Sequence, residues 1–244
     1  MGTERILITV RTYPNLSVKY NEVVCTGGIT EDGDWRRLYP IQHRSLEKEK
    51  QYKTFDIVNV KVSDTSPDGR PESRRPDCSS LQIEGHLDDP HQRWDWIGRT
   101  ALESMAELEQ SEWTLRPVRV SEILKFEAEE DSHEWSQKQK EILRQESLFG
   151  DPKPLEKIPY DFKFTWKDGL GKEYRSKFIA WEVGQTWRRM RDKEKVIQAF
   201  WDKRFSDRYS LYFFMGNFAA HRQHYGVCGI YNPPREVTSS ESLF

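Results

Sequence analysis

Aromatic rings and guanidinium groups alternate in the segment GDWRRLYP, at residues 33–40. Arginine binds phosphate through parallel hydrogen bonds, and aromatic rings stack on bases. Alternate side chains of a β-strand share a face, so Trp35, Arg37 and Tyr39 would lie on one side. If that side is open, it predicts a platform on which bases stack. If it is closed, both rings belong to the core and Arg37 extends past them to solvent.

Two further groups of basic residues could extend such a surface. Three arginines lie in SPDGRPESRRPD, at 66–77, whose Pro, Gly and Asp residues are typical of a loop. A helix predicted over 184–205 carries cations on one face, although Asp192 and Glu194 beside them also fit an ordinary solvent-exposed surface. The residues predicted to bind nucleic acid are Trp35, Arg36, Arg37, Tyr39, Arg44, Arg70, Arg74, Arg75, Arg188, Arg191 and Lys195.

Three other polar residues are candidates for catalysis. Glu182 lies among apolar residues at a predicted helix start, and His221 and His224 are three residues apart. If they met in one pocket, they could serve a nuclease or hydrolase. The alternative for Glu182 is an acid that favours the helix dipole. The cysteines are far apart in sequence, and neither a paired metal-ligand spacing nor a glycine-rich phosphate loop occurs, so no metal and no cofactor is predicted.

The composition predicts a folded protein with little net charge. The 244 residues suffice for one large domain or two small ones, and 13% of them are aromatic. The formal net charge is −2, so a nucleic-acid partner would need a local basic patch. The odd number of cysteines, with no cleavable leader and no apolar span of about 20 residues, predicts a cytoplasmic location without membrane contact.

The order of apolar patterns predicts an α+β fold with mainly antiparallel pairing. Strands are predicted at 5–13, 20–29, 35–41, 55–62 and 80–87, with an Asp32-Gly33 turn before the third. Helices are predicted over 94–109, 133–147 and 184–205, and further strands at 211–217 and 225–231. The predicted organisation is a β-rich, barrel-like (OB-like) domain at 1–126, a charged helix and Pro-rich connector at 127–157, an α+β domain with one long helix at 158–235, and a mobile tail at 236–244.

Several motifs resemble those of a family of small, uncharacterised bacterial proteins. They are TYP at 12–14, KYNEVVCTGGI at 19–29, GDWRRLYP at 33–40, RPES at 70–73, AWEVG at 180–184 and LYFFMGN at 211–217, so the resemblance covers nearly the whole chain. Members of that family carry Cys/His pairs where this chain has KDGLGKEYRSK, at 167–177, so the resemblance implies no zinc site here. The hairpin is also similar to OB-like barrel proteins, which implies binding of nucleic acid or a nucleotide.

Three functional hypotheses follow from these observations. The first is a non-catalytic protein that binds DNA or RNA in a basic, aromatic cleft and works with protein partners in a larger bacterial assembly. The second is an enzyme acting on nucleic acid or a nucleotide, with Glu182, His221 and His224 at its centre. The third is a protein-interaction adaptor, which near-neutral charge and many aromatic residues suit equally well.

Overall fold

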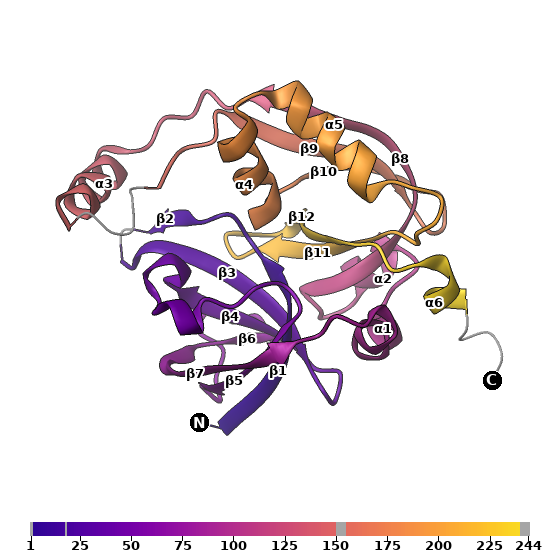
Figure 1. The fold of residues 1–244 in the computed structure, drawn as a ribbon, viewed down its shortest axis with the longest axis horizontal. Helices are drawn as coiled ribbons and strands as arrows, with labels where there is room; N and C mark the ends of the chain where they lie inside the picture. The colour runs from indigo at the N-terminus through magenta and orange to yellow at the C-terminus, as the bar shows by residue number, and fades with distance from the viewer. Residues whose placement is uncertain (1, 18, 150–154, 240–244) are drawn as a thin grey trace.

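Two curled, mainly antiparallel sheets form the framework of the fold, as the computed structural model shows for residues 2–17, 19–149 and 155–239 (Figure 1). Each sheet curls into a half-barrel, and helices α4 (Trp181–Met190) and α5 (Lys193–Arg204) cover the second one. The predicted α+β class, with mainly antiparallel pairing and a barrel-like N-terminal part, is confirmed.

The first sheet contains the strands β1 (Gly2–Arg11), β2 (Asn15–Ser17), β3 (Asn21–Thr30), β4 (Trp35–Ile41), β5 (Asp56–Val62), β6 (Ser73–Arg74) and β7 (Pro76–His86). Their order is β6-β4-β3-β1-β5-β7, with β2 paired to β3. Strand β1 lies at the centre and is fully buried at Ile6, Leu7 and Ile8, because both of its faces pack against apolar neighbours. The sheet therefore forms around a continuous apolar run of the sequence.

The turn between β3 and β4 has the geometry that its Asp-Gly pair predicts. Gly33 has a φ of +90°, and the Thr30 N–H donates to the Asp34 carbonyl at 2.9 Å. On its other side β4 pairs in parallel with β6, which places Arg37 opposite Ser73. The GDWRRLYP strand and the RPES loop are thus neighbours in space although about 35 residues separate them in sequence.

The second sheet contains β8 (Leu115–Glu130), β9 (Tyr160–Asp168), β10 (Glu173–Lys177), β11 (Tyr212–Phe218) and β12 (His221–Tyr231). Their order is β10-β9-β8-β11-β12, and every pair is antiparallel. Strand β8 pairs with β11 near its start and with β9 from Val120 to Glu130. Residue 126, where the sequence predicts a domain boundary, therefore lies inside one continuous strand.

The helix predicted over 184–205 is wrong as a single element. Arg191 ends α4 in the left-handed conformation, with a φ of 55°, and Asp192 caps α5 by accepting hydrogen bonds from the N–H groups of Glu194 and Lys195. The apolar spacing continues across this break because both helices pack on the same core. Periodicity alone therefore predicts one helix where the chain forms two.

The other helical predictions differ from the structure in their extent. The segment predicted as a helix over 94–109 divides into α1 (Pro90–Ile97), a 3₁₀ turn (Gly98–Thr100) and α2 (Met105–Gln110). The charged helix expected over 133–147 is α3 (Gln137–Phe149). Part of the predicted tail forms α6 (Arg235–Ser239), in which Val237 is buried, while 240–244 lie outside the described residues. Two further 3₁₀ turns are His43–Ser45 and Lys48–Lys50.

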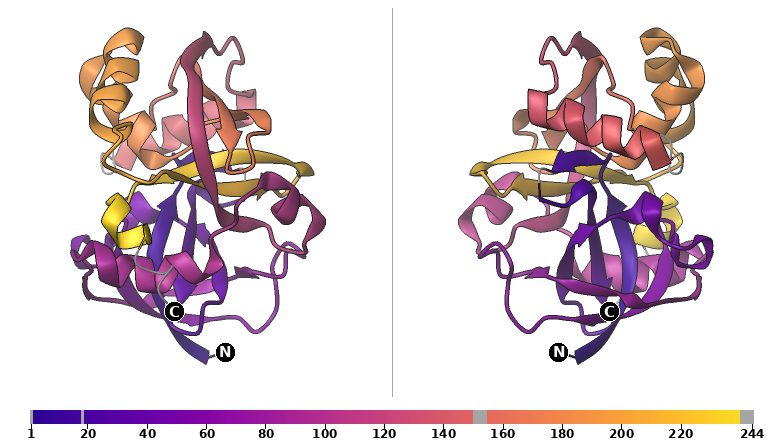
Figure 2. Two further views of the ribbon diagram at one scale, coloured as in Figure 1. Left: turned by 90° about the vertical axis from the view of Figure 1, so that its right-hand side faces the viewer. Right: turned by 90° about the vertical axis from the view of Figure 1, so that its left-hand side faces the viewer.

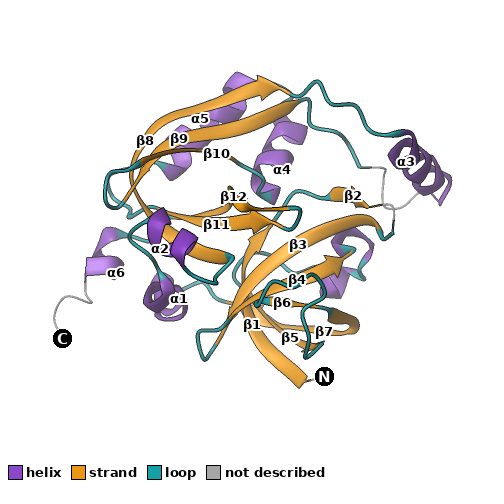
Figure 3. Cartoon of the chain, turned by 180° about the vertical axis from the view of Figure 1, so that it is seen from behind, coloured by secondary structure: helices purple, strands orange, loops and turns teal. Residues whose placement is uncertain are grey.

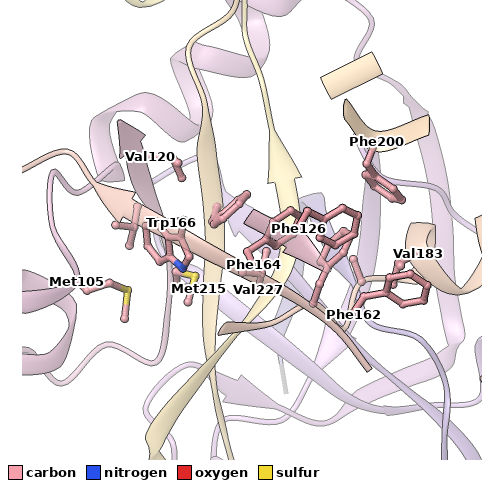
Figure 4. Close-up of a cluster of buried hydrophobic side chains, with 14 of the residues drawn as sticks. Met105, Val120, Phe126, Phe162, Phe164, Trp166, Val183, Phe200, Met215 and Val227 are labelled. Atoms are coloured by element: carbon pink, nitrogen blue, oxygen red, sulfur yellow. The ribbon is translucent and has the colours of Figure 1, made fainter. Parts of the chain in front are cut away.

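A large aromatic core lies between the second sheet and the two helices α4 and α5 (Figure 4). Phe126 of β8 stacks on Phe164 of β9, with ring centroids 4.2 Å apart. Val183 of α4 and Phe200 of α5 pack against the same cluster. Large rings bury much apolar area per residue, which explains how a chain with 36% hydrophobic residues fills this core.

A second apolar cluster joins the two sheets. Leu7 and Trp35 from the first sheet pack in one cluster with Leu115 and Phe214 from the second. The views from the sides and from behind show β11 and β12 lying between the first sheet and the helices (Figures 2 and 3). Because this cluster draws on both sheets, the N-terminal and C-terminal halves share a buried contact.

Candidate functional site

The strand face predicted as a stacking platform is closed. Trp35 is 1% exposed and its indole N–H donates to the Thr100 hydroxyl at 3.0 Å. Arg37 is 2% exposed, and its Nε donates to the Thr114 hydroxyl at 2.9 Å. The open-platform interpretation is therefore wrong for these two residues, because the start of the second sheet covers them. The alternative, in which Trp35 and Tyr39 both lie in the core, holds for Trp35, but Tyr39 is only partly buried and Arg37 does not reach solvent.

Arg37 belongs to a buried polar group that we call the inter-sheet network, made of Arg37, Glu72, Thr114 and Arg116. The Glu72 carboxylate accepts hydrogen bonds from the backbone N–H of Thr114, at 3.0 Å, and from the Thr114 hydroxyl. The same carboxylate pairs with Arg116, and Arg37 lies 4.0 Å from it. The network connects β4, the RPES loop and β8. All four residues are buried, so their side chains are not accessible to a ligand.

Arg70 also serves the fold. It is buried, its Nε donates to Asp68 at 3.0 Å, and its Nη1 donates to the Asn217 carbonyl at 3.1 Å. The loop at 66–77 is thereby fastened to β11. The prediction of Arg70 as a phosphate contact does not agree with this burial, because a phosphate could not reach the guanidinium group without displacing these partners.

Most of the other predicted cations are neutralised by carboxylates. Arg191 is the clearest example, with Nη2 2.8 Å from a Glu156 oxygen. Such exposed pairs contribute little to stability, but they cancel the positive charge that a phosphate would need. The pairs are Arg36 with Glu4 at 2.8 Å, Arg44 with Glu22 at 2.6 Å, Arg188 and Arg191 with Glu156, and Lys195 with Asp192 at 3.7 Å.

A different group of residues gathers on the outer side of the first sheet. We call it the Tyr20 surface; it consists of Lys19, Tyr20, Tyr39, Arg74 and Arg75. The two tyrosine rings meet edge to face, with centroids 6.5 Å apart and an interplanar angle of 87°. The Arg75 Nη2 lies 3.5 Å from the Tyr20 hydroxyl, and the Lys19 ammonium lies 5.0 Å from the Tyr20 ring centroid. Both rings are only partly buried.

The cations of the Tyr20 surface have no acid partner within the described residues. Among the described residues, Arg74 donates to the backbone carbonyls of Pro71, at 2.7 Å, and Ser73, at 2.9 Å, and these neutral acceptors leave its charge in place. The pKa of the Tyr20 hydroxyl is lowered, first by a side-chain hydrogen bond from Lys19 and then by the positive charges of Lys19 and Arg75. A tyrosinate is favoured where the local potential is positive, and so is a phosphate.

A hollow of about 340 Å³ lies beside Tyr20. Its size falls at the lower end of the range for small-ligand sites. Gln42 fixes one wall by donating from its side-chain amide to the Tyr20 carbonyl at 2.7 Å. The hollow is lined by Lys19, Tyr20, Asn21, Pro40, Gln42, Ser45, Leu46 and Cys78.

Sequence reasoning found part of this surface and missed the rest. Tyr39, Arg74 and Arg75 were predicted as binding residues, although the predicted partners of Tyr39 were Trp35 and Arg37. Lys19 and Tyr20 were not predicted, even though they open the KYNEVVCTGGI motif. The available signal was a lysine followed by an aromatic residue at the start of a strand. Only the fold shows that this pair meets Arg75 from the distant loop.

The three catalytic candidates do not line one pocket. His221 and His224 are exposed in β12, with ring centroids 5.9 Å apart. Glu182 lies in a groove between α4 and α5 that neither histidine lines. Burial raises the pKa of the Glu182 carboxyl. In the described ranges, no three His, Cys, Asp or Glu residues are grouped so that they could hold a metal ion.

Within the same ranges, no helix is both long and apolar enough to cross a membrane. A comparison with curated proteins finds no match for the chain. Family models do match: residues 2–103 match a Domain of unknown function (DUF8758), and residues 97–244 match another (DUF8757). The two matches overlap at residues 97–103, which include the 3₁₀ turn after α1. Because the second match covers more than half of the sequence, the chain belongs to the uncharacterised family described as Domain of unknown function (DUF8757).

Proposed function

We propose that the protein binds single-stranded nucleic acid through the Tyr20 surface. The observation that carries this proposal is the contrast in pairing: Arg74 and Arg75 lack an acid partner in the part of the chain that the structure describes, and Arg75 lies beside Tyr20, whose ring meets Tyr39 edge to face. Phosphates would bind Lys19, Arg74 and Arg75, and release of counterions would drive the association. A cytoplasmic location is part of this proposal and suits the free thiols of the three cysteines.

The tyrosine rings favour a single strand over a duplex. In a duplex the base faces are stacked on each other, whereas a single strand can turn its bases onto protein rings. Tyr20 offers its ring beside the hollow, and Tyr39 supports it edge to face. Because stacking is tolerant of sequence, we expect weak discrimination among bases.

The enzyme hypothesis is not proposed further. It required Glu182, His221 and His224 to meet, and the histidines lie in β12 while the glutamate lies between α4 and α5. The adaptor hypothesis remains an outcome of the binding test: a protein that retains its fold and binds no oligonucleotide would favour it.

Fluorescence anisotropy with labelled 12-nucleotide DNA and RNA tests the proposal. We expect binding that weakens steeply between roughly 50 and 200 mM salt, with a slope that falls by about one unit for each phosphate contact removed. The double variant Arg74→Ala/Arg75→Ala should reduce the affinity about ten-fold or more, and Tyr20→Ala should reduce it by roughly 1–3 kcal/mol.

The matched control is Arg188→Ala/Arg191→Ala, which removes two arginines that are already paired with Glu156. Its affinity should remain close to that of the unaltered protein. Equal losses in the two double variants would show that the binding is diffuse and not located at the Tyr20 surface. Affinity that does not change with salt would contradict phosphate contacts altogether.

A further inference from the structure

A second site with its own chemistry lies in the groove between α4 and α5. The two helices run antiparallel (Figure 1), and Ala199 leaves room where a larger side chain would fill the space between them. The resulting pocket has a volume of about 240 Å³. It is lined by Glu182, Thr186, Arg189, Ala199, Phe200, Lys203 and Arg204. The pocket is separate from the Tyr20 surface, which is formed by the first sheet.

Helix periodicity explains why these residues face one another. Glu182, Thr186 and Arg189 are spaced by four and three residues, so they share one face of α4. Ala199 and Lys203 are four apart and share one face of α5. The groove is therefore built by two regular faces and does not depend on a loop.

The charges of this pocket are unbalanced. Arg189 and Lys203 form no ion pair with any described residue, and Arg204 donates to the neutral side-chain oxygen of Asn232 at 3.2 Å. The lining thus contains three cations and a single carboxyl group. That carboxyl, Glu182, has no ion pair in the described chain either, and it lies at the first turn of α4, where the helix dipole adds positive potential.

The state of the Glu182 carboxyl decides what the pocket can hold. Burial raises its pKa, and the charges of Arg11 on β1 and Arg204 on α5 oppose that rise by a smaller amount. A bound anion would favour the neutral form still more, because a carboxylate beside it would repel it. A neutral carboxyl can donate a hydrogen bond to an anion, which the ionised form cannot.

We propose that this pocket binds a small tetrahedral oxyanion, the phosphate group of a phosphate monoester or free phosphate, between Arg189, Lys203 and Arg204. The Thr186 hydroxyl and the protonated Glu182 carboxyl would donate hydrogen bonds to its remaining oxygens. A tetrahedral anion has enough acceptors for all five groups, whereas a planar carboxylate ligand would leave some of them unmatched. The site does not depend on nucleic-acid binding at the Tyr20 surface.

Sulfate and phosphate test different parts of this proposal. Isothermal titration calorimetry with inorganic phosphate and with a nucleoside 5′-monophosphate distinguishes free phosphate from a monoester as the preferred ligand. Sulfate gives the pH dependence, because it stays a dianion across the range studied and only the protein titrates. We expect the sulfate affinity to rise as the pH falls from 7.5 to 5.5, since protonation of Glu182 removes a repulsive charge. Arg189, Lys203, Arg204 and Arg11 are the charged groups that face this carboxyl or share its pocket.

Two kinds of variant make the test specific. Ala199→Leu fills the groove without a change of charge and should abolish sulfate binding, and Arg189→Ala/Lys203→Ala should weaken it on the order of ten-fold. Glu182→Gln keeps a hydrogen-bond donor, so it should bind sulfate more tightly at pH 7.5 and lose the pH dependence. The matched control Arg188→Ala lies next in sequence to Arg189 but outside the pocket, and should bind as the unaltered protein does.

Several results would overturn the site. These are an absence of sulfate binding by the folded protein at either pH, equal binding by the Arg189→Ala/Lys203→Ala variant, or an unchanged pH dependence in Glu182→Gln. Because Arg189 and Lys203 are exposed, their variants should fold even if Ala199→Leu does not. Oligonucleotide affinity should be the same in Arg189→Ala/Lys203→Ala as in the unaltered protein, so failure of this site and failure of the Tyr20 surface give different results.

Discussion

The inter-sheet network and the Tyr20 surface are both rich in arginine and aromatic residues, and they lie on neighbouring strands. In the first, Arg37 and Arg116 are buried and share the carboxylate of Glu72. In the second, Arg75 is exposed and its Nη2 lies 3.5 Å from the hydroxyl of Tyr20. Residue type does not distinguish the two regions. The presence of a carboxylate and the depth of burial do.

The residues around β6 contribute to both regions. Glu72 immediately precedes β6 and is buried at the contact between the sheets, whereas Arg74, the last residue of β6, is half-buried and Arg75 after it is exposed. Leaving a buried charge without a partner costs several kcal/mol, so the buried arginines require the acid, while the exposed ones are solvated by water. An exposed cation without a partner is therefore compatible with the fold and available to a ligand.

Removing the acid of the inter-sheet network should have the largest effect on stability. Glu72→Ala deprives Arg116 of its partner and the Thr114 N–H of its acceptor. We expect a loss of about 3–5 kcal/mol in the free energy of unfolding, since the arginine charges would remain buried without compensation. Urea unfolding followed by circular dichroism measures this loss.

Glu156→Ala is the surface counterpart, because it removes the partner of Arg188 and Arg191 on α4 and its C-terminal end. Its effect should stay within about 1 kcal/mol. If the two glutamate variants lost the same stability, burial would not be what separates the two regions.

A second buried group, the imidazole of His43, should make the free energy of unfolding depend on pH. His43 is 4% exposed, and burial together with the nearby charge of Arg11 lowers its pKa to about 4. The unfolded state, with an ordinary pKa of about 6.5, then binds more protons than the folded state. The free energy of unfolding should fall as the pH decreases from about 6.5 to about 4, by roughly 3 kcal/mol from this residue.

Unfolding measured at several pH values for the unaltered protein and for His43→Gln isolates that contribution. Glutamine keeps a donor for the Tyr52 carbonyl, which lies 2.9 Å from His43 Nε2, but it does not titrate in this range. The two pH profiles should diverge between pH 6.5 and 4. Parallel profiles would mean that His43 becomes protonated without resistance from the fold.

The sequence was sufficient for most of the fold because its local signals were strong. The apolar run of β1 and the Asp32-Gly33 turn both form as predicted. The helix break at Arg191 was not predicted, because apolar spacing continues through it. Asp192 with Glu194 after it is typical of the start of a new helix, but the continuous apolar spacing favoured a single one. The sequence did not show that β8 continues through residue 126, because alternation in its charged half resembles a solvated segment.

The site was less predictable because it depends on contacts distant in sequence. Alternation correctly placed Trp35 and Arg37 on one face, but it could not show that Thr114 would cover that face. Likewise, the pairing of Arg191 with Glu156 is decided by the path of the chain after α3. Alternation within one β-strand shows which side of the sheet a residue occupies. The tertiary fold decides whether that side is open to solvent.

The role of the acid partner can also be tested by creating an unpaired cation. Glu156→Gln removes the negative charge beside Arg188 and Arg191 and keeps the volume of the side chain. If partnerless arginines are what binds phosphate, this variant should bind oligonucleotide roughly two- to five-fold more tightly at low salt, with a slightly steeper salt slope. Anisotropy at two salt concentrations measures both. Unchanged affinity would show that α4 is too far from the bound strand to contribute.

The last prediction concerns the pKa of the Tyr20 hydroxyl, which depends on the electrostatic potential at the Tyr20 surface. Lys19 and Arg75 lower the pKa of the Tyr20 hydroxyl, whereas burial raises the pKa of Tyr39 beside it. In Lys19→Ala/Arg75→Ala, the Tyr20 hydroxyl should titrate closer to the ordinary value of about 10, because the positive charges that favour tyrosinate are gone. NMR with ring-labelled tyrosine, assigned through Tyr20→Phe, resolves this residue from the others. A titration of Tyr20 that stays the same in the double variant would mean that the two cations do not create a positive potential there, and the proposed binding of phosphate would lose its electrostatic basis.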